Sequence, residues 1–315
     1  LHLCDRRQRQ MCIRDSVITL ETQIQTNMKA TFTIDNPLPP LWLMYPEISQ
    51  CSIGWRMGYG EYYLWKFNDW FNELSEEMQL KYQKMFPAPH AWEGYYQDTI
   101  GNKFQHGICF WQPDGLPGFS LEQLLTDTAN GTNFEYLFFW GHYAKKEISK
   151  SCFSQWWKAS FRVDTHDYCC MEQYMMAEKA RIFEDEEIRK QIFTETDPKT
   201  IKQLGRKIKN FNQEIWDKCK YSIILNGNYA KFLQNKELFD FLLSTGNKIL
   251  VEASPYDTIW GVGMEEANPQ INNPFLWKGQ NLLGFALMEV RNELKRICQS
   301  YQLINWEQVK KEIEA

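Results

Sequence analysis

The sequence places a carboxylate and an ammonium group on one face of a predicted helix, where both could take part in chemistry. The pattern over residues 168–183 (YCCMEQYMMAEKARIF) predicts this helix. The shared face carries, in chain order, Glu172, Met175, Met176, Lys179 and Phe183. Burying either charge among these apolar side chains costs several kcal/mol unless it is paired or solvated.

Two explanations fit this stripe. Seven residues of helix separate Glu172 from Lys179 by about 10.5 Å along the axis, which is too far for a good salt bridge. The spacing therefore favours a pocket in which a ligand or further polar groups lie between the two charges. A partly exposed helix edge would explain the same pattern, so the stripe alone does not decide.

Composition indicates a globular protein. The 315 residues are 43% hydrophobic and 24% charged, and they suffice for two domains of ordinary size. A net charge of −5 excludes a general polyanion binder, although a local basic face remains open. The 13 Trp, 15 Tyr and 20 Phe predict large buried aromatic clusters and, in places, a stacking surface.

The cysteine and histidine positions argue against a metal site or a disulfide framework. Nine cysteines occur without any C-x-x-C spacing, and the five histidines are scattered. We therefore expect reduced thiols, no metal and no cofactor. No apolar run approaches the roughly 18 residues of a membrane span, and no signal-peptide core is evident. These features predict a cytoplasmic protein that does not enter a membrane.

The chain divides into unequal parts. Residues 1–16 resemble a translated sequencing adapter, and we expect them to be non-native and detached from the packed body, with Met28 as a plausible true start. Residues 17–130 form an aromatic-rich, partly helical N-terminal region of unknown function, with a domain boundary near Gly131. Residues 97–133 are predicted to be irregular apart from a short amphipathic piece at Leu121–Leu125. Residues 131–301 form the second domain, and 302–315 are a C-terminal tail.

Helices dominate the second domain. Asp197 and Pro198 predict the start of a helix over 197–211, with Gly205 and Arg206 in its middle. A glycine there suggests close approach by another backbone or a ligand, whereas the surrounding lysines are typical of a solvated face. Further helices are predicted around 214–226, over 229–244 and from about Asn281, with an extended piece at 248–254.

Nine sequence blocks in the second domain resemble the NADAR (YbiA-like) family. They occur in the family's order with family-like spacing. The blocks are FWGH (139–142), FSQWW (153–157), MEQYMMAEKA (171–180), LGR (204–206), KF (231–232), LLSTG (242–246), LVEAS (250–254), DTIWGVG (257–263) and WKGQNLLGFALMEVRNEL (277–294).

The resemblance implies a compact, mainly α, orthogonal helical domain with N-glycosidase activity. Family substrates are phosphorylated riboflavin-biosynthesis intermediates and, in some members, ADP-ribose on guanine in nucleic acid. The family's catalytic residues match Glu172, Asp257 and Trp260. The substrate-binding residues expected from the matching blocks are Phe153, Ser154, Gln155, Lys179, Arg206, Gly261 and Asn281.

The chemistry of the residues agrees with this resemblance. Cleavage of an N-glycosidic bond passes through an oxocarbenium-like state, which a carboxylate stabilises or supplies with an activated water. Lys179 and Arg206 could hold phosphates, and Trp260 could stack on a base or sugar. Phe153, Trp156 and Trp157 are alternatives for stacking, although as core residues they need no ligand.

Two other function classes remain. One is a binding module for ADP-ribose or NAD without turnover, against which the carboxylates argue. The other is delivery of the domain to DNA by the N-terminal region, which the acidic net charge disfavours. The expected partner is a small nucleotide substrate or ADP-ribosylated nucleic acid, and the sequence leaves the oligomeric state open.

Overall fold

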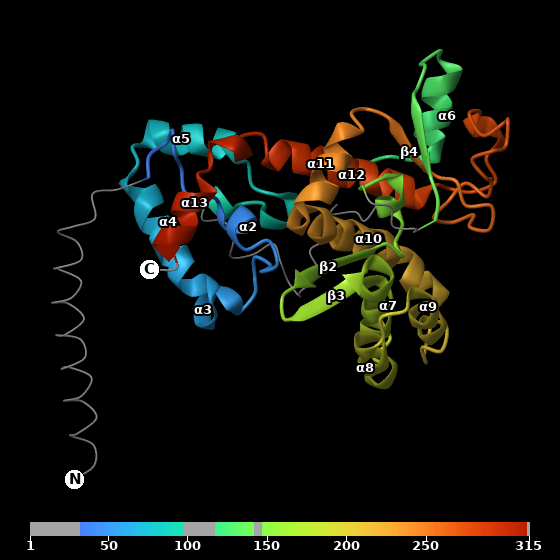
Figure 1. The fold of residues 1–315 in the computed structure, drawn as a ribbon, viewed down its shortest axis with the longest axis horizontal. Helices are drawn as coiled ribbons and strands as arrows, with labels where there is room; N and C mark the ends of the chain where they lie inside the picture. The colour runs from blue at the N-terminus through green and yellow to red at the C-terminus, as the bar shows by residue number, and fades with distance from the viewer. Residues whose placement is uncertain (1–31, 98–116, 142–146, 314–315) are drawn as a thin grey trace, which may run out of the picture.

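The computed structural model describes residues 32–97, 117–141 and 147–313, which form a mainly helical molecule with two small sheets (Figure 1). The predicted mainly α class is confirmed, whereas the orthogonal arrangement stays a prediction. The adapter-like segment 1–16 and His142 lie outside the described residues.

Most of the elements along the described parts of the chain are α-helices. The α-helices are α2 (Leu41–Met44), α3 (Gly54–Met57), α4 (Gly60–Glu73), α5 (Glu76–Met85), α6 (Leu121–Ala129), α7 (Met171–Ile182), α8 (Glu186–Thr194), α9 (Pro198–Gly205), α10 (Gln213–Gln234), α11 (Lys236–Ser244), α12 (Leu282–Ile297) and α13 (Trp306–Ile313). The strands are β1 (Tyr136–Phe139), β2 (Lys158–Val163), β3 (His166–Cys170) and β4 (Ile249–Glu252).

An aromatic cluster holds the N-terminal region together. Helix α4 buries Tyr63, Phe67 and Trp70. The proline-rich entry to this region leaves carbonyl groups that no helix satisfies, and Tyr82 donates a hydrogen bond to one of them, the Leu38 carbonyl, at 2.7 Å. Ring packing and satisfied carbonyls together fix an otherwise irregular segment.

The C-terminal helix packs on the N-terminal region. Glu312 of α13 forms a 3.2 Å ion pair with Lys66 of α4, and Gln308 accepts a 2.8 Å hydrogen bond from Asn36. In Figure 1, α13 accordingly lies among the helices of the N-terminal region. The predicted tail thus completes the region at the opposite end of the sequence.

The two sheets connect distant parts of the chain. Strands β1 and β4 pair in parallel, with Phe139 opposite Glu252, and this confirms the predicted extended piece. Strands β2 and β3 form an antiparallel hairpin. Asp164 at the hairpin turn has a left-handed backbone (φ 51°), and its carboxylate accepts a 2.8 Å hydrogen bond from the Ser49 hydroxyl. The hairpin therefore contacts the N-terminal region.

Helix α7 begins later than the sequence predicts. Residues 168–170 belong to strand β3, so the helix starts at Met171 rather than Tyr168. The residues at this junction are buried apolar ones that suit either a strand or a helix, and pairing with β2 decides between them.

Helix α9 ends earlier than predicted. Asp197 caps its N-terminus through a 2.9 Å hydrogen bond from the Thr200 amide, as expected. The helix stops at Gly205, so the prediction of a mid-helix Gly205–Arg206 pair was wrong. The close approach at Gly205 comes from Met176 of α7, whose sulfur would lie 1.9 Å from an added Cβ atom.

Helix α10 is continuous where two helices were predicted. It runs from Gln213 to Gln234 through Gly227, which the sequence marks as a break. An added Cβ at Gly227 would lie 2.5 Å from the Tyr174 ring, so this glycine allows α7 to pack closely on α10. Downstream, α11 ends at Ser244 before the left-handed Gly246, as predicted. Among the described helices, none has the length and apolar character that crossing a bilayer requires.

Candidate active site

Glu172 is a buried carboxylate with one oxygen left unpaired. It lies in the first turn of α7 and is 2% exposed. Its Oε2 accepts a 3.2 Å hydrogen bond from Trp156 Nε1, whereas Oε1 has no hydrogen-bond partner among the described residues. Burial raises the pKa of Glu172 to about 7, against the opposing effects of Lys202 and the Trp156 hydrogen bond. Such a carboxyl group can take up and release a proton near neutral pH.

A second carboxyl group, Glu252, shares this environment. It ends strand β4, and its Oε2 is enclosed without a hydrogen-bond partner in the described part of the chain. Burial raises the pKa of Glu252 to about 8, and the nearby charges of Asp257 and Glu172 add to the increase. Two carboxyl groups that repel each other's ionisation are a common arrangement for acid–base work.

A cation and a third carboxylate complete the electrostatic cluster. Lys202 on α9 lowers the pKa values of both Glu172 and Glu252, and its Nζ lies 5.8 Å from the centre of the Trp156 ring. Asp257 raises both pKa values. Asp257 also shapes its own loop, since its Oδ1 accepts hydrogen bonds from the Ile259 and Trp260 amides at 2.9 and 2.8 Å.

Local folding explains why Trp156 meets Glu172. Buried Lys231 of α10 donates hydrogen bonds to the Cys152 and Ser154 carbonyls at 2.6 and 3.2 Å, which fixes the turn before Trp156. The Gln155 carbonyl then accepts the Glu172 amide at 2.9 Å. That bond satisfies one of the free amide groups at the start of α7 and ties the turn to the helix.

Asn281 and Gly261 support Glu252 from behind. Asn281 is fully buried, and its side chain accepts a 3.0 Å hydrogen bond from the Glu252 amide and donates one of 2.9 Å to the Leu250 carbonyl. A Cβ atom at Gly261 would lie 2.7 Å from the Glu252 carbonyl oxygen. Both predicted site residues therefore position the loop and strand that carry the carboxylates.

The two predicted phosphate-binding residues differ in their surroundings. Lys179 Nζ donates a 3.2 Å hydrogen bond to the Gly205 carbonyl and lies 4.2 Å from the centre of the Phe211 ring. Arg206 is exposed at the end of α9 and still lowers the pKa of Glu172. Arg206 is thus free to meet a ligand from solvent, while Lys179 already holds α9 against α7.

The predicted aromatic residues also separate. Phe153 is fully buried, with its ring centre 5.4 Å from those of Phe139 and Phe241, so it lies in the core. Ser154 is buried and accepts a 3.2 Å hydrogen bond from the Trp156 amide. Trp260 is partly buried beside Asp257. The structure therefore gathers Glu172, Asp257, Gln155 and Arg206, and leaves Phe153 away from solvent.

Three residues of this cluster escaped the sequence-based list of site residues. Glu252 stands inside the matched LVEAS block, where it reads as part of an extended apolar piece. Lys202 looks like one of several lysines on a solvated helix face. The sequence indicates only a stacking role for Trp156, because its hydrogen bond to Glu172 depends on the turn that Lys231 holds.

The metal prediction concerns the same residues. Within the ranges that the structure describes, no three or more His, Cys, Asp and Glu side chains are grouped so as to hold a metal ion. The carboxylates are instead accompanied by Lys202 and the Trp156 indole.

Comparison with known proteins agrees with the sequence blocks. Residues 138–295 match the NADAR domain model. N-glycosidase R617 of Acanthamoeba polyphaga mimivirus is 44% identical over 165 residues, which cover 50% of this chain and 96% of that protein. Protein irg-1 of Caenorhabditis elegans is 37% identical over 129 residues, covering 40% and 61% of the two chains.

A bacterial relative has a solved structure. N-glycosidase YbiA of Escherichia coli (strain K12) is 31% identical over 144 residues, covering 46% of this chain and 79% of that protein. The NMR structure of the E. coli protein YbiA gives a TM-score of 0.41 at 27% identity, covering 51% of this chain and 87% of that one. The family model spans half of the sequence, and the chain belongs to the NADAR domain family.

Proposed function

We propose that this protein is an N-glycosidase that hydrolyses the bond between a ribosyl carbon and a base nitrogen. The carrying observation is the Glu172 carboxylate, which is buried at the start of α7 with Oε1 unpaired and with its pKa raised by burial to about 7. Relatives named N-glycosidases across most of their own length support the reaction class. A buried carboxylate oxygen without a hydrogen-bond partner destabilises the fold. A protein that only bound its ligand would gain nothing from keeping such a group.

The reaction assigns separate tasks to the two glutamates. As the C1′–N bond breaks, its electrons pass to the base and positive charge develops on C1′ and the ring oxygen. Glu172 stabilises that charge and takes a proton from the water that attacks C1′. Burial raises the pKa of Glu252 to about 8, so Glu252 is protonated at neutral pH and gives its proton to the departing nitrogen. The products are the protonated base and a sugar with a hydroxyl on C1′.

The neighbouring residues orient the substrate. Asp257 keeps the 257–260 loop in place and adds negative charge near the developing cation. Trp260, partly exposed beside it, offers a face for the base or sugar. Lys202 and Arg206 supply positive charge for phosphate groups, and this favours a phosphorylated substrate.

The substrate is a ribosylated, phosphorylated base, either a riboflavin-pathway intermediate or ADP-ribosylated guanine in nucleic acid. Purified protein should be incubated with an aminopyrimidine ribotide and, separately, with an oligonucleotide that carries ADP-ribosylated guanine. Release of free base or of unmodified oligonucleotide, followed by chromatography, identifies the substrate. Binding of ADP-ribose by calorimetry without turnover of either compound would instead indicate a binding module.

A further inference from the structure

A cavity lies between the N-terminal region and the NADAR domain, and the carboxylates of the candidate active site do not line it. Its volume is about 430 Å³, within the range of small-molecule sites. It is bordered by the 46–51 loop, the hairpin turn at 163–166 and helices α7, α8 and α10. The lining of this cavity does not include Glu172, Glu252 or Asp257.

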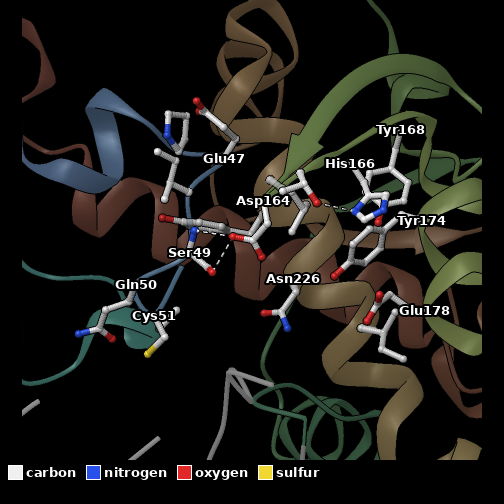
Figure 2. Close-up of a pocket in the computed structure, with 18 of the residues that line it drawn as sticks. Glu47, Ser49, Gln50, Cys51, Asp164, His166, Tyr168, Tyr174, Glu178 and Asn226 are labelled. Atoms are coloured by element: carbon white, nitrogen blue, oxygen red, sulfur yellow. Dashed lines mark hydrogen bonds between the residues drawn. The ribbon is translucent and has the colours of Figure 1, made fainter. Parts of the chain in front are cut away.

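Helix α7 separates this cavity from the candidate active site. Tyr174 and Glu178 line the cavity, whereas Glu172 and Lys179 lie on the opposite side of the helix. Tyr174 is two residues after Glu172, which corresponds to a rotation of about 200° around the axis. Figure 2 shows the Tyr174 hydroxyl directed between Glu178 and Asn226.

Tyr174 and Tyr168, whose side chains are 6% and 4% exposed, line the cavity. Two further lining residues have enclosed polar atoms with no hydrogen-bond partner in the described parts of the chain. They are the indole nitrogen of Trp42 and the side-chain amide of Gln50. Because buried polar groups in native proteins are nearly always hydrogen-bonded, this set indicates a ligand.

The walls of the cavity favour a planar molecule. Trp42, Trp92, Tyr168 and Tyr174 all line it, and the Tyr168 and Tyr174 rings meet edge to face with centres 5.0 Å apart. Aromatic walls contact flat rings efficiently, and the unpaired donors and acceptors match ring nitrogens and carbonyl groups.

The charges of the cavity favour a neutral ligand. Arg181 already forms a 2.8 Å ion pair with Glu178, and Arg189 forms one of 3.0 Å with Glu186. The lining also includes the carboxylates of Glu47 and Asp164. Both arginines are ion-paired, although Arg189 Nε has no hydrogen-bond partner among the described residues. Because the carboxylates of Glu47, Asp164 and Glu178 outnumber the two arginines in the lining, the local charge disfavours a phosphate group.

We propose that this cavity is a binding site for a neutral, planar heteroaromatic molecule of nucleoside size, distinct from the catalytic site. The ligand contacts the Tyr174 hydroxyl on one side and the 46–51 loop on the other. Binding therefore joins the N-terminal region to the NADAR domain, at the helix that also carries Glu172. This proposal does not depend on the reaction proposed above.

Calorimetry with adenosine, guanosine and uridine, and with their 5′-monophosphates, tests the site. The Glu172→Gln protein is used beside the wild type, so that turnover does not disturb the titration. We expect at least one nucleoside to bind both proteins equally, and more tightly than its monophosphate. Tyr174→Phe keeps the ring and removes only the hydroxyl, so its melting temperature should not fall, while its affinity should drop about five- to ten-fold.

The matched control is Tyr62→Phe, on exposed Tyr62 of α4 outside the cavity, which should leave affinity unchanged. Failure of all three nucleosides to bind the folded protein would overturn the proposal. So would equal affinity in the Tyr174→Phe protein, or tighter binding of the monophosphates. Binding that Glu172→Gln abolishes would place the ligand at the catalytic site and would likewise contradict a separate cavity site.

Discussion

Trp156 donates its indole hydrogen to one oxygen of Glu172 at 3.2 Å, and the other oxygen of that carboxylate has no hydrogen-bond partner among the described residues. This asymmetry fixes the carboxylate plane and leaves one oxygen for a substrate or water. The hydrogen bond also favours the ionised form of Glu172, which burial disfavours. The Trp156 indole therefore contributes both to the orientation of the central carboxylate and, together with burial and Lys202, to its proton affinity.

Replacing Trp156 by Phe should alter the acid side of the pH–rate profile. Without the indole hydrogen bond, the pKa of Glu172 should rise further and the carboxylate should lose its fixed orientation. We expect kcat at pH 7 to fall roughly ten-fold, because a single lost hydrogen bond to a charged group is worth about 1.5 kcal/mol or more. Trp65→Phe, at an exposed tryptophan, is the control. An unaltered profile in the Trp156→Phe protein would remove this residue from the mechanism.

The wild-type rate should show a bell-shaped pH dependence. Activity requires one ionised and one protonated carboxyl group, and burial raises the two pKa values to about 7 and about 8. The groups interact, so the two limbs report apparent pKa values of the pair. Glu252→Gln should lose the alkaline limb and reduce kcat, most strongly for a poor leaving base. A Glu252→Gln protein with the wild-type bell would show that Glu252 is not the acid.

Stability should fall as pH rises through the same range. The folded-state pKa of Glu172 is raised from 4.5 to about 7, so the folded protein binds the proton more tightly than the unfolded chain. Its stabilising contribution is complete below about pH 4.5 and is lost by about pH 7. Above that pH, Glu172→Gln should stabilise the protein by at most about 3 kcal/mol.

Thermal melts of wild type and Glu172→Gln at pH 5 and pH 8 measure this effect. The mutant should gain stability relative to the wild type only at the higher pH. Glu265→Gln, at an exposed carboxylate, should show no such difference between the two pH values. A Glu172→Gln protein that melts lower than the wild type at pH 8 would contradict the assignment of an unpaired, destabilising charge.

Lys202→Met should weaken phosphate recognition. If Lys202 binds a substrate phosphate, its loss raises KM more than it lowers kcat, because phosphate binding is largely the same in ground and transition states. We expect KM to increase about ten-fold or more for a phosphorylated substrate and to change little for the dephosphorylated one. Lys199→Met on the exposed face of the same helix is the matched control. Equal effects of the two mutations would assign Lys202 to a general electrostatic role.

Local signals in the sequence predict many of the elements correctly. Asp197 and Gly246 mark a helix start and a helix end that the structure confirms, because capping is encoded in one or two residues. No such local signal predicts that α10 continues through Gly227. That glycine serves a contact with Tyr174, more than fifty residues earlier in the chain, and tertiary packing outweighs its low helix propensity.

The candidate site also contains residues that local sequence predicts and residues that only tertiary contacts bring together. Glu172 was evident because a charge within an apolar stripe is visible in sequence. Glu252 was not, since its proximity to Glu172 arises only when β4 pairs with β1 and Asn281 holds the end of the strand. Asn281, predicted to bind substrate, is fully buried and bonds the Glu252 amide and the Leu250 carbonyl. Sequence spacing alone does not reveal these backbone contacts.

The most direct test of the central claim is kcat for Glu172→Gln, measured on a preparation whose melting curve shows a folded protein. The substitution keeps the side-chain volume and removes the negative charge. We predict that kcat falls by about 10²- to 10⁴-fold while substrate binding survives, since the ground state carries little positive charge on the sugar. A folded Glu172→Gln protein with wild-type kcat would contradict the assignment of Glu172 as the catalytic carboxylate.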